Sequence, residues 1–195
     1  MRLHDDAGNR LYVNGAYAAA YKKVDVAYPA IEIDADVAKH ARDNTGADIE
    51  VANFMTIDDG KTYDVIFASQ VFEHIATPYE FLQKAAASLT PGGILHLDVP
   101  NHESLTSQIR KYVGKRDYGF IQPPHHMYAY TPHSLAHVLK MNDFNNVTTK
   151  QYRNDNAVWG QLVYRSSLKT KMLYTMAGLI GRGSLLTAIA QSPKN

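Results

Sequence analysis

The chain has 195 residues, enough for one domain with a sizeable core. Hydrophobic residues make up 45% and charged residues 20%, an ordinary globular composition, and the net charge of +1 excludes binding to nucleic acid through overall charge. The absence of cysteine excludes disulfides, thiolate zinc sites and cysteine nucleophiles. It fits a reducing compartment, and we expect a cytoplasmic protein.

The chain divides into a polar and aromatic lead segment, residues 1–28, and a domain over residues 29–195. Strand-like runs are predicted at residues 28–34, 47–54, 63–69, 93–100, 145–153 and 184–192. Helical patterns are predicted at residues 16–23, 34–44, 77–89, 131–144 and 169–179. Because strands alternate with helices, we predict an α/β fold with a mostly parallel sheet.

Cap residues mark the predicted helix starts. Asp34 or Asp36 is a suitable N-cap for the helix over residues 34–44. Thr77 and Thr131 each precede a proline that suits the first helical position, and Glu80 lies three residues after Thr77, as in a capping box. The sequence Thr-Pro-Gly-Gly that follows predicts a turn closing the helix over residues 77–89.

Two stretches bear on export and membranes. The N-terminus lacks the apolar core of a signal peptide. The apolar stretch from Met172 to Ala190 is interrupted by Gly-Arg-Gly at 181–183, whereas a membrane span needs about 20 mostly apolar residues. We therefore expect no membrane span.

Polar residues gather where the strand over residues 63–69 ends. Ser69, Gln70, Glu73 and His74 follow an apolar run within YDVIFASQVFEHIATP. In open parallel sheets, ligands bind beyond the carboxyl ends of the strands. The sequence therefore predicts a ligand crevice at this strand exit.

Three segments in order carry a family resemblance: YDVIFASQVFEHIATPYEFLQKAAASLTPGGILHLDVPN, HHMYAYTPHSLAHVLKMNDF and GRGSLLTAIAQ. Together they resemble the class I S-adenosylmethionine-dependent methyltransferases, especially the ubiquinone-biosynthesis O-methyltransferases and related small-molecule enzymes. The resemblance covers about residues 31–191. It implies a Rossmann-like three-layer sandwich with an antiparallel final strand. It also implies methyl transfer from S-adenosylmethionine to a small-molecule acceptor.

The resemblance also implies which residues bind the cofactor. Glu32 aligns with the acid that accepts hydrogen bonds from the ribose hydroxyls, and Asp34 is the nearby alternative. Asn53 and Phe54 occupy the adenine positions, where asparagine keeps the acceptor of the usual acid. Ser69 and Gln70 fall beside the methionine end of the cofactor.

On the acceptor side, His126 matches a family histidine and would act as general base, with His74 in reserve. The alternative roles are a loop anchor for His126 and a turn cap for Glu73 and His74. Residues 103–131 form the lid or acceptor segment, with an aromatic cluster that lines a pocket or makes a small core: Tyr112, Tyr118, Phe120, Tyr128 and Tyr130. No zinc-binding spacing occurs, so we predict no metal site.

The glycine-rich cofactor loop of the family is missing. The glycines before Asp64 are isolated: Gly8, Gly15, Gly46 and Gly60. The N-terminal half of the sheet is therefore predicted to be incomplete, by an internal deletion as the favoured explanation. Alternatively, residues 10–15, RLYVNG, fill the gap, or the chain is a non-catalytic binding or scaffold module. An unfilled sheet centre would also permit a homodimer. A nucleotide-dependent oxidoreductase is a weaker alternative, because no G-x-G-x-x-G is present.

Overall fold

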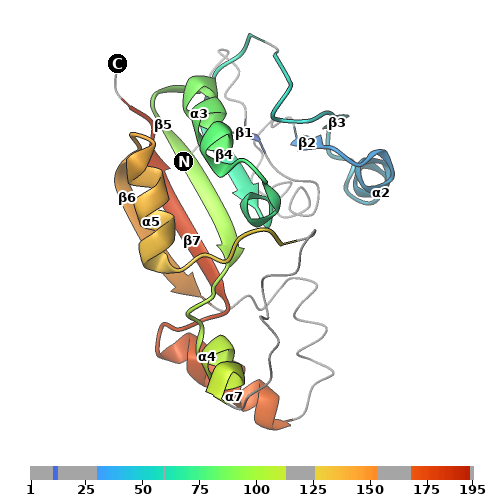
Figure 1. The fold of residues 1–195 in the computed structure, drawn as a ribbon. Helices are drawn as coiled ribbons and strands as arrows, with labels where there is room; N and C mark the ends of the chain where they lie inside the picture. The colour runs from blue at the N-terminus through green and yellow to red at the C-terminus, as the bar shows by residue number, and fades with distance from the viewer. Residues whose placement is uncertain (1–10, 13–29, 59, 113–125, 153–167, 194–195) are drawn as a thin grey trace, which may run out of the picture.

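The computed structural model describes residues 11–12, 30–58, 60–112, 126–152 and 168–193 (Figure 1). Five strands form the main sheet: β1 (Leu11–Tyr12), β4 (Tyr63–Ser69), β5 (Leu89–Pro100), β6 (Asn145–Tyr152) and β7 (Leu185–Gln191). Two short strands form a separate pair: β2 (Ala30–Glu32) and β3 (Ile49–Val51).

The main sheet has the strand order β1-β4-β5-β7-β6. β4 is parallel to both β1 and β5, whereas β7 is antiparallel to both β5 and β6. β2 and β3 are parallel to each other. The predicted α/β fold, with a mostly parallel open sheet and an antiparallel final strand, is therefore confirmed.

Five α-helices and one 3₁₀-helix are described: α2 (Ala35–Thr45), η3 (Phe72–His74), α3 (Pro78–Ser88), α4 (Leu105–Tyr112), α5 (Pro132–Met141) and α7 (Leu168–Leu179). α3 and α5 lie on the same side of the main sheet, and α4 and α7 pair beyond the carboxyl end of β5 (Figure 1). The helix predicted over residues 16–23 lies outside the described residues.

Apolar burial between the sheet and the two covering helices builds the core. The largest fully buried apolar side chains of this core come from β4, β5 and β7, from η3, and from one face each of α3 and α5: Ile66, Phe72, Phe81, Leu82, Leu95, Leu97, Leu135, Leu139 and Leu186. Burial of each such side chain contributes roughly 1.5–3 kcal/mol. The core therefore holds β4 and β5 rigidly at the point where the polar residues follow.

The β2–α2–β3 unit packs through small residues. Ala30, Ala38, Ala41 and Ile49 form a cluster with Phe67 of β4, which joins this unit to the main sheet.

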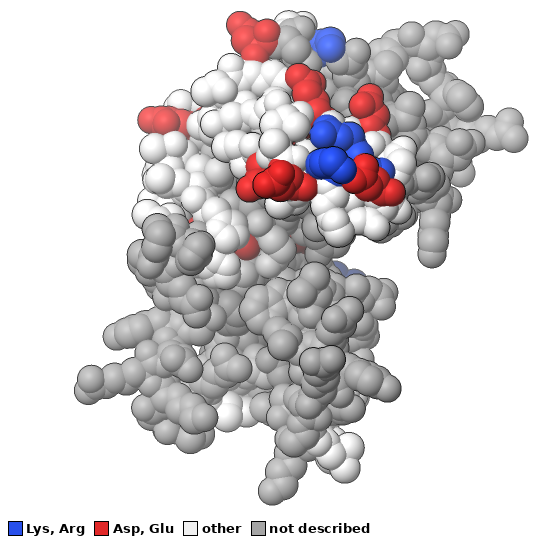
Figure 2. Space-filling view, turned by 90° about the vertical axis from the view of Figure 1, so that its right-hand side faces the viewer, with Lys and Arg blue, Asp and Glu red and all other residues white. Residues whose placement is uncertain are grey.

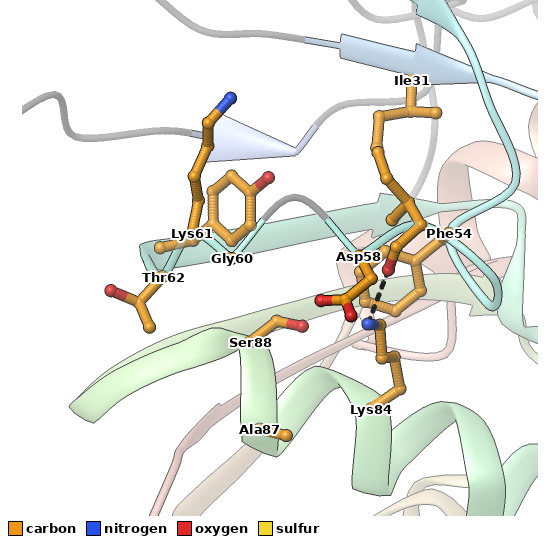
Figure 3. A pocket seen from close by; sticks show the side chains of 11 residues that line it. Ile31, Phe54, Asp58, Gly60, Lys61, Thr62, Lys84, Ala87 and Ser88 are labelled. Carbon is orange, nitrogen blue, oxygen red and sulfur yellow. Dashed lines mark hydrogen bonds between the residues drawn. The ribbon is translucent and has the colours of Figure 1, made fainter.

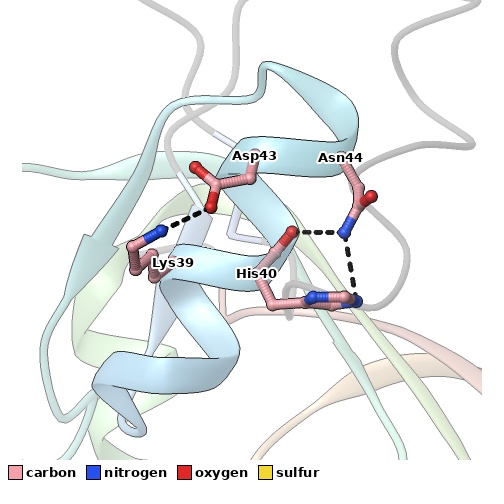
Figure 4. Close-up of polar contacts among 4 residues, drawn as sticks. All are labelled: Lys39, His40, Asp43 and Asn44. Carbon is pink, nitrogen blue, oxygen red and sulfur yellow. Dashed lines mark hydrogen bonds and ion pairs between the residues drawn. The ribbon is translucent and has the colours of Figure 1, made fainter.

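The outer face of α2 carries solvated polar pairs. Lys39 Nζ lies 2.6 Å from Asp43 Oδ2, and Asn44 bonds the His40 carbonyl at 2.7 Å (Figure 4). The Lys39 ammonium holds the pKa of Asp43 below its ordinary value. In Figure 2 acidic and basic side chains are interspersed over the face shown, so the described part of this face has no single-sign patch.

The N-terminal half of the sheet is partly filled. Leu11 and Tyr12, which belong to the RLYVNG segment, pair in parallel with Val65 and Ile66 of β4 as a two-residue strand. This segment was the alternative to the favoured deletion. β2 and β3 form a separate two-stranded sheet, in keeping with the predicted incomplete N-terminal half.

Two of the three predicted helix caps form side-chain hydrogen bonds. Asp34 is the N-cap of α2 and accepts from the Asp36 and Val37 N–H groups. Thr131 caps α5 in a capping box with Ser134. Thr77 makes no side-chain cap hydrogen bond, so the capping box predicted for α3 is wrong.

The Thr-Pro-Gly-Gly sequence does not separate helix and strand. β5 already begins at Leu89, opposite Tyr63, and the register then jumps so that Ile94 pairs with Val65. The four residues are a bulge inside β5, where Gly92 takes φ +76°. The prediction of a backbone bend at these residues was therefore correct. The prediction that the bend lies between the helix and the strand was wrong, because it lies inside β5.

The apolar stretch over residues 172–190 also divides as expected. α7 ends at Leu179 and β7 begins at Leu185, with Gly181 at φ +69° between them. Among the residues that the structure describes, no helix is long and apolar enough to cross a membrane.

Replacing Gly93 by alanine should destabilise the bulge. An added Cβ would lie 2.9 Å from the Thr90 carbonyl oxygen and 3.1 Å from the Asp64 carbonyl oxygen, both of which belong to the backbone. We expect Gly93→Ala to lower the unfolding free energy by about 2 kcal/mol in urea denaturation.

Gly60→Ala is the matched control, since nothing lies within 4 Å of its added Cβ and only its φ of +65° is strained. It should cost about 1 kcal/mol. Equal stability of Gly93→Ala and the wild type would contradict the packing of this bulge.

Candidate functional site

The carboxyl end of β4 turns sharply at Gln70. Ser69 is fully buried and pairs with Asp98 of β5. Gln70 takes φ +55°, a left-handed conformation that is uncommon for glutamine, and its N–H donates to the Asp98 carbonyl at 2.7 Å. The chain therefore leaves the sheet in a fixed direction and enters η3. Strained backbone of this kind gathers at functional sites.

Glu73 is the buried acid of the site. It is fully buried in the 3₁₀-helix, and neither carboxyl oxygen has a hydrogen-bond partner among the described residues. Burial, with a smaller contribution from Asp98, raises the pKa of Glu73 from 4.5 to about 8. At neutral pH Glu73 is therefore mostly protonated.

Asp98 on the neighbouring strand has the opposite character. Burial favours its neutral form, but hydrogen bonds from His96 and Thr187 outweigh burial and lower the pKa of Asp98. Its Oδ1 lies 2.5 Å from Thr187 Oγ1 and 3.3 Å from His96 Nε2. The carboxyl ends of β4 and β5 thus carry one neutral and one ionised acid, the division typical of acid–base sites.

Residues 126–130 are bound to η3 by the backbone. The Met127 and Tyr128 N–H groups donate to the Glu73 carbonyl at 2.9 and 3.3 Å. The Tyr128 hydroxyl donates to the Ala76 carbonyl at 3.2 Å, and the Tyr130 ring stacks on Phe72 at 5.1 Å. These contacts hold His126 beside the strand exit although it is distant in sequence.

His74 and His126 meet at the surface of this site. Their ring centroids are 4.7 Å apart in an edge-on arrangement, and His74 Nε2 lies 3.7 Å from Glu73 Oε1. Ligand atoms of Glu73, His74 and His126 all lie within 4.8 Å of one another. Two imidazoles and a carboxylate are donors that suit a zinc-like cation, so this cluster is where the described residues could hold a metal. Sequence spacing gave no sign of it.

Tyr130 contributes a second buried polar atom. Its hydroxyl has no hydrogen-bond partner among the described residues. Burial, with smaller contributions from Tyr128 and Glu73, raises the pKa of Tyr130 above its ordinary value. Tyr130 therefore stays a neutral donor beside Glu73, as part of the small aromatic core that was one alternative for the lid segment. Tyr118 and Phe120 of the predicted aromatic cluster lie outside the described residues.

Glu32 and Asp34 occupy different positions at the end of β2. Both Asp34 cap bonds use Oδ1, at 2.9 Å to the Asp36 N–H and 3.0 Å to the Val37 N–H. Glu32 is the last residue of β2 and accepts one bond, from the Asp34 N–H to its Oε1 at 3.1 Å. The Asp34 carboxylate is therefore engaged in capping α2, while the Glu32 carboxylate at the end of β2 can accept further hydrogen bonds.

Asn53 and Phe54 follow β3. The Asn53 side-chain oxygen accepts from the Met55 N–H at 2.9 Å, and its carbonyl accepts from the Ile57 N–H at 2.9 Å, so Asn53 forms a local turn. The Phe54 ring is 6% exposed and packs on Phe81 at 5.2 Å. Phe54 is thus mainly a core residue.

Phe54 also lines a cavity of about 270 Å³ (Figure 3). Its wall includes Ile31, Tyr63 and Lys84, whose Nζ donates to the Ile57 carbonyl at 2.7 Å. Tyr63 begins β4, roughly 20 Å from the strand's carboxyl end. Of the predicted site residues, only Phe54 lines this cavity, and none of Glu73, His74 and His126 does.

A family model described as "Methyltransferase domain" matches residues 13–149. The chain belongs to this methyltransferase family. The resemblance to class I S-adenosylmethionine-dependent methyltransferases is confirmed, and S-adenosylmethionine is the family's cofactor.

One curated relative matches a short segment. It is the "Ubiquinone biosynthesis O-methyltransferase" of Parvibaculum lavamentivorans, 43% identical over 42 residues. The match covers 22% of this chain and only 17% of that relative.

Two solved structures share the methyltransferase fold. A SAM-dependent methyltransferase from Archaeoglobus fulgidus aligns with TM-score 0.63 at 16% identity, over 94% of this chain and 86% of that one. The N-methyltransferase NodS of Bradyrhizobium japonicum, in complex with S-adenosyl-L-homocysteine, aligns with TM-score 0.59 at 13% identity, over 95% and 78%.

The raised pKa of Glu73 predicts a stability that depends on pH. Because the folded-state pKa of about 8 exceeds 4.5, the folded protein holds one extra proton between these values. The unfolding free energy should therefore fall as pH rises from 4.5 to about 8. Glu73→Gln, which keeps the shape but cannot ionise, should flatten this slope, so that between pH 4.5 and high pH it loses about 5 kcal/mol less unfolding free energy than the wild type.

Urea denaturation across this pH range measures the effect, with Glu80→Gln on α3 as the control at another glutamate. Parallel pH profiles for the wild type and Glu73→Gln would show that Glu73 ionises normally in the folded protein.

Proposed function

We propose that the chain transfers a methyl group from S-adenosylmethionine to a nucleophilic atom of a small-molecule acceptor at the carboxyl ends of β2 and β4. The observation that carries the proposal is the convergence of Glu73, His74 and His126 at the exit of β4. This is the edge where open α/β sheets bind their ligands.

The residues at the ends of these strands would suit the cofactor. Glu32, at the carboxyl end of β2, would accept hydrogen bonds from the ribose hydroxyls, because only one bond to its carboxylate is present. Asn53 and Phe54 would border the adenine, and Ser69 and Gln70 the methionine end. When bound, S-adenosylmethionine supplies an electrophilic methyl group on a sulfonium sulfur. The left-handed turn at Gln70 would bring backbone close to the cofactor, a task that glycines perform in the family's loop.

His126 would serve as general base on the acceptor side. It is partly buried, and its segment is fixed by the two bonds to the Glu73 carbonyl, so its ring is held in position. A neutral imidazole there would take a proton from an acceptor hydroxyl or ammonium group while the site holds that atom in line. His74 would orient His126 through the edge-on ring contact and stands as the reserve base.

Glu32→Gln and Asp34→Asn separate the two candidate ribose acids. We expect Glu32→Gln to weaken S-adenosylhomocysteine binding about tenfold or more, because an amide offers fewer acceptors. Asp34→Asn should keep the α2 cap, because asparagine caps a helix about as well as aspartate, and should change binding by less than about threefold. Equilibrium dialysis with labelled S-adenosylhomocysteine measures both, and a larger loss in Asp34→Asn would reverse the assignment.

His126→Gln should lower turnover about 100-fold or more with S-adenosylhomocysteine affinity unchanged, since it removes a base and leaves the cofactor residues intact. S-adenosylhomocysteine release from a panel of phenols, hydroxy acids and amines is the readout. His133→Gln, on the exposed face of α5, is the matched control.

Dialysis against EDTA separates direct proton transfer from a metal on the same cluster. Activity that survives EDTA supports His126 as base. Activity that is lost and returns with added zinc would reassign His126 to a ligand.

The alternative function is a non-catalytic scaffold, which predicts no cofactor binding in a folded chain.

The proposal also includes a cytoplasmic location, in keeping with a sequence free of cysteine. A homodimer stays a prediction that light scattering tests.

A further inference from the structure

The cavity of about 270 Å³ beside the start of β4 has one apolar wall that is held in place by the core. Ile31, Phe54 and Tyr63 line it, and they are only 5%, 6% and 8% exposed because the rest of each side chain packs in the main core. Pockets for drug-sized ligands span about 300–1,000 Å³, so this cavity suits a smaller ligand with an apolar part.

Polar side chains meet on the other side of the cavity. Asp58, Lys84 and Ser88 point toward one another across it, whereas Lys61, the second cation of the wall, points away from them (Figure 3). Within the described ranges, the side chains of Asp58 and Ser88 have no hydrogen-bond partner. The cavity therefore offers a carboxylate and a hydroxyl that the protein itself does not use.

The two charges that face the cavity are kept apart. Asp58 and Lys84 line the same small space, yet no ion pair joins these two described residues. Lys84 Nζ instead donates to the Ile57 carbonyl at 2.7 Å, which fixes the ammonium and leaves it further hydrogens to donate. A fixed cation and an unpaired carboxylate across one cavity complement a ligand that carries both charges.

We propose that this cavity binds a small zwitterion, an α-amino acid with an apolar side chain. The ligand carboxylate would accept hydrogen bonds from the Lys84 ammonium and the Ser88 hydroxyl, and the ligand ammonium would donate to the Asp58 carboxylate. The ligand side chain would pack on the apolar wall. The inference stands apart from the proposed methyl transfer, because Tyr63 of the cavity begins β4 and the Glu73–His74–His126 cluster follows its end.

Ligands with a single charge fit the cavity less well. A simple anion on Lys84 would lie close to the Asp58 carboxylate, and a simple cation on Asp58 would lie close to the Lys84 ammonium. Each arrangement brings like charges together, which costs free energy. The zwitterion satisfies both residues at once.

An NMR titration of the full chain with L-leucine tests the proposal. We expect backbone amide shifts centred on residues 60–63 and 84–88, with a dissociation constant on the order of 1 mM. Isocaproate lacks the ammonium of leucine, and isoamylamine lacks its carboxylate. Each should bind about tenfold more weakly than leucine, because one charged side chain then stays without its partner.

Two variants separate the two charges. Asp58→Asn should weaken leucine binding about tenfold without weakening isocaproate binding. Lys84→Gln should weaken leucine and isocaproate binding about tenfold without weakening isoamylamine binding. Lys140→Gln and Asp143→Asn make the same changes at exposed positions around the end of α5, away from the cavity, and should leave leucine binding unchanged.

Circular dichroism checks that each variant keeps its fold. The proposal would be overturned by the absence of shifts at about 20 mM leucine, by shifts centred elsewhere in the chain, or by wild-type affinity for leucine in both folded cavity variants. Tighter binding of isocaproate than of leucine would also overturn it and would assign the cavity to a simple carboxylate.

Discussion

The hydrogen bond from the Gln70 N–H to the Asp98 carbonyl is the contact on which the site depends. It closes the parallel pairing of β4 with β5, whose register places Ser69 opposite Asp98. The apolar core holds both strands, so the left-handed turn at Gln70 occurs at one fixed point. η3 then buries Glu73 and exposes His74.

Burial and hydrogen bonding then give the polar groups of the site different charges and roles. Glu73 lies in a water-excluded position and holds its proton, while Asp98 is kept ionised by His96 and Thr187. The Glu73 backbone has a separate task, because its carbonyl anchors the segment that carries His126. Glu73 thus links the strand exit to the segment of His126 through its main chain and influences the charge of the site through its side chain.

The sequence predicted the elements well because their signals are local. The strand at 63–69 and the caps at Asp34 and Thr131 each follow from residues close in sequence. The failures are non-local. A two-residue strand such as β1 has no periodicity and exists only because β4 offers it an edge. The bulge at residues 90–93 depends on pairing with β4. The approach of His126 to His74 depends on backbone bonds across about 50 residues, which no spacing rule encodes.

The central claim is that this chain binds the family's cofactor without the family's glycine-rich loop. β1 pairs with β4 over two residues where the family's first strand is expected, and Glu32 at the end of β2 accepts one hydrogen bond and can accept more. The most direct measurement is calorimetric titration of the purified, folded chain with S-adenosylhomocysteine. The account predicts saturable one-to-one binding with a dissociation constant on the order of micromolar, about −8 kcal/mol. No heat of binding from a chain shown to be folded would contradict it and would place the protein among the non-catalytic relatives of these enzymes.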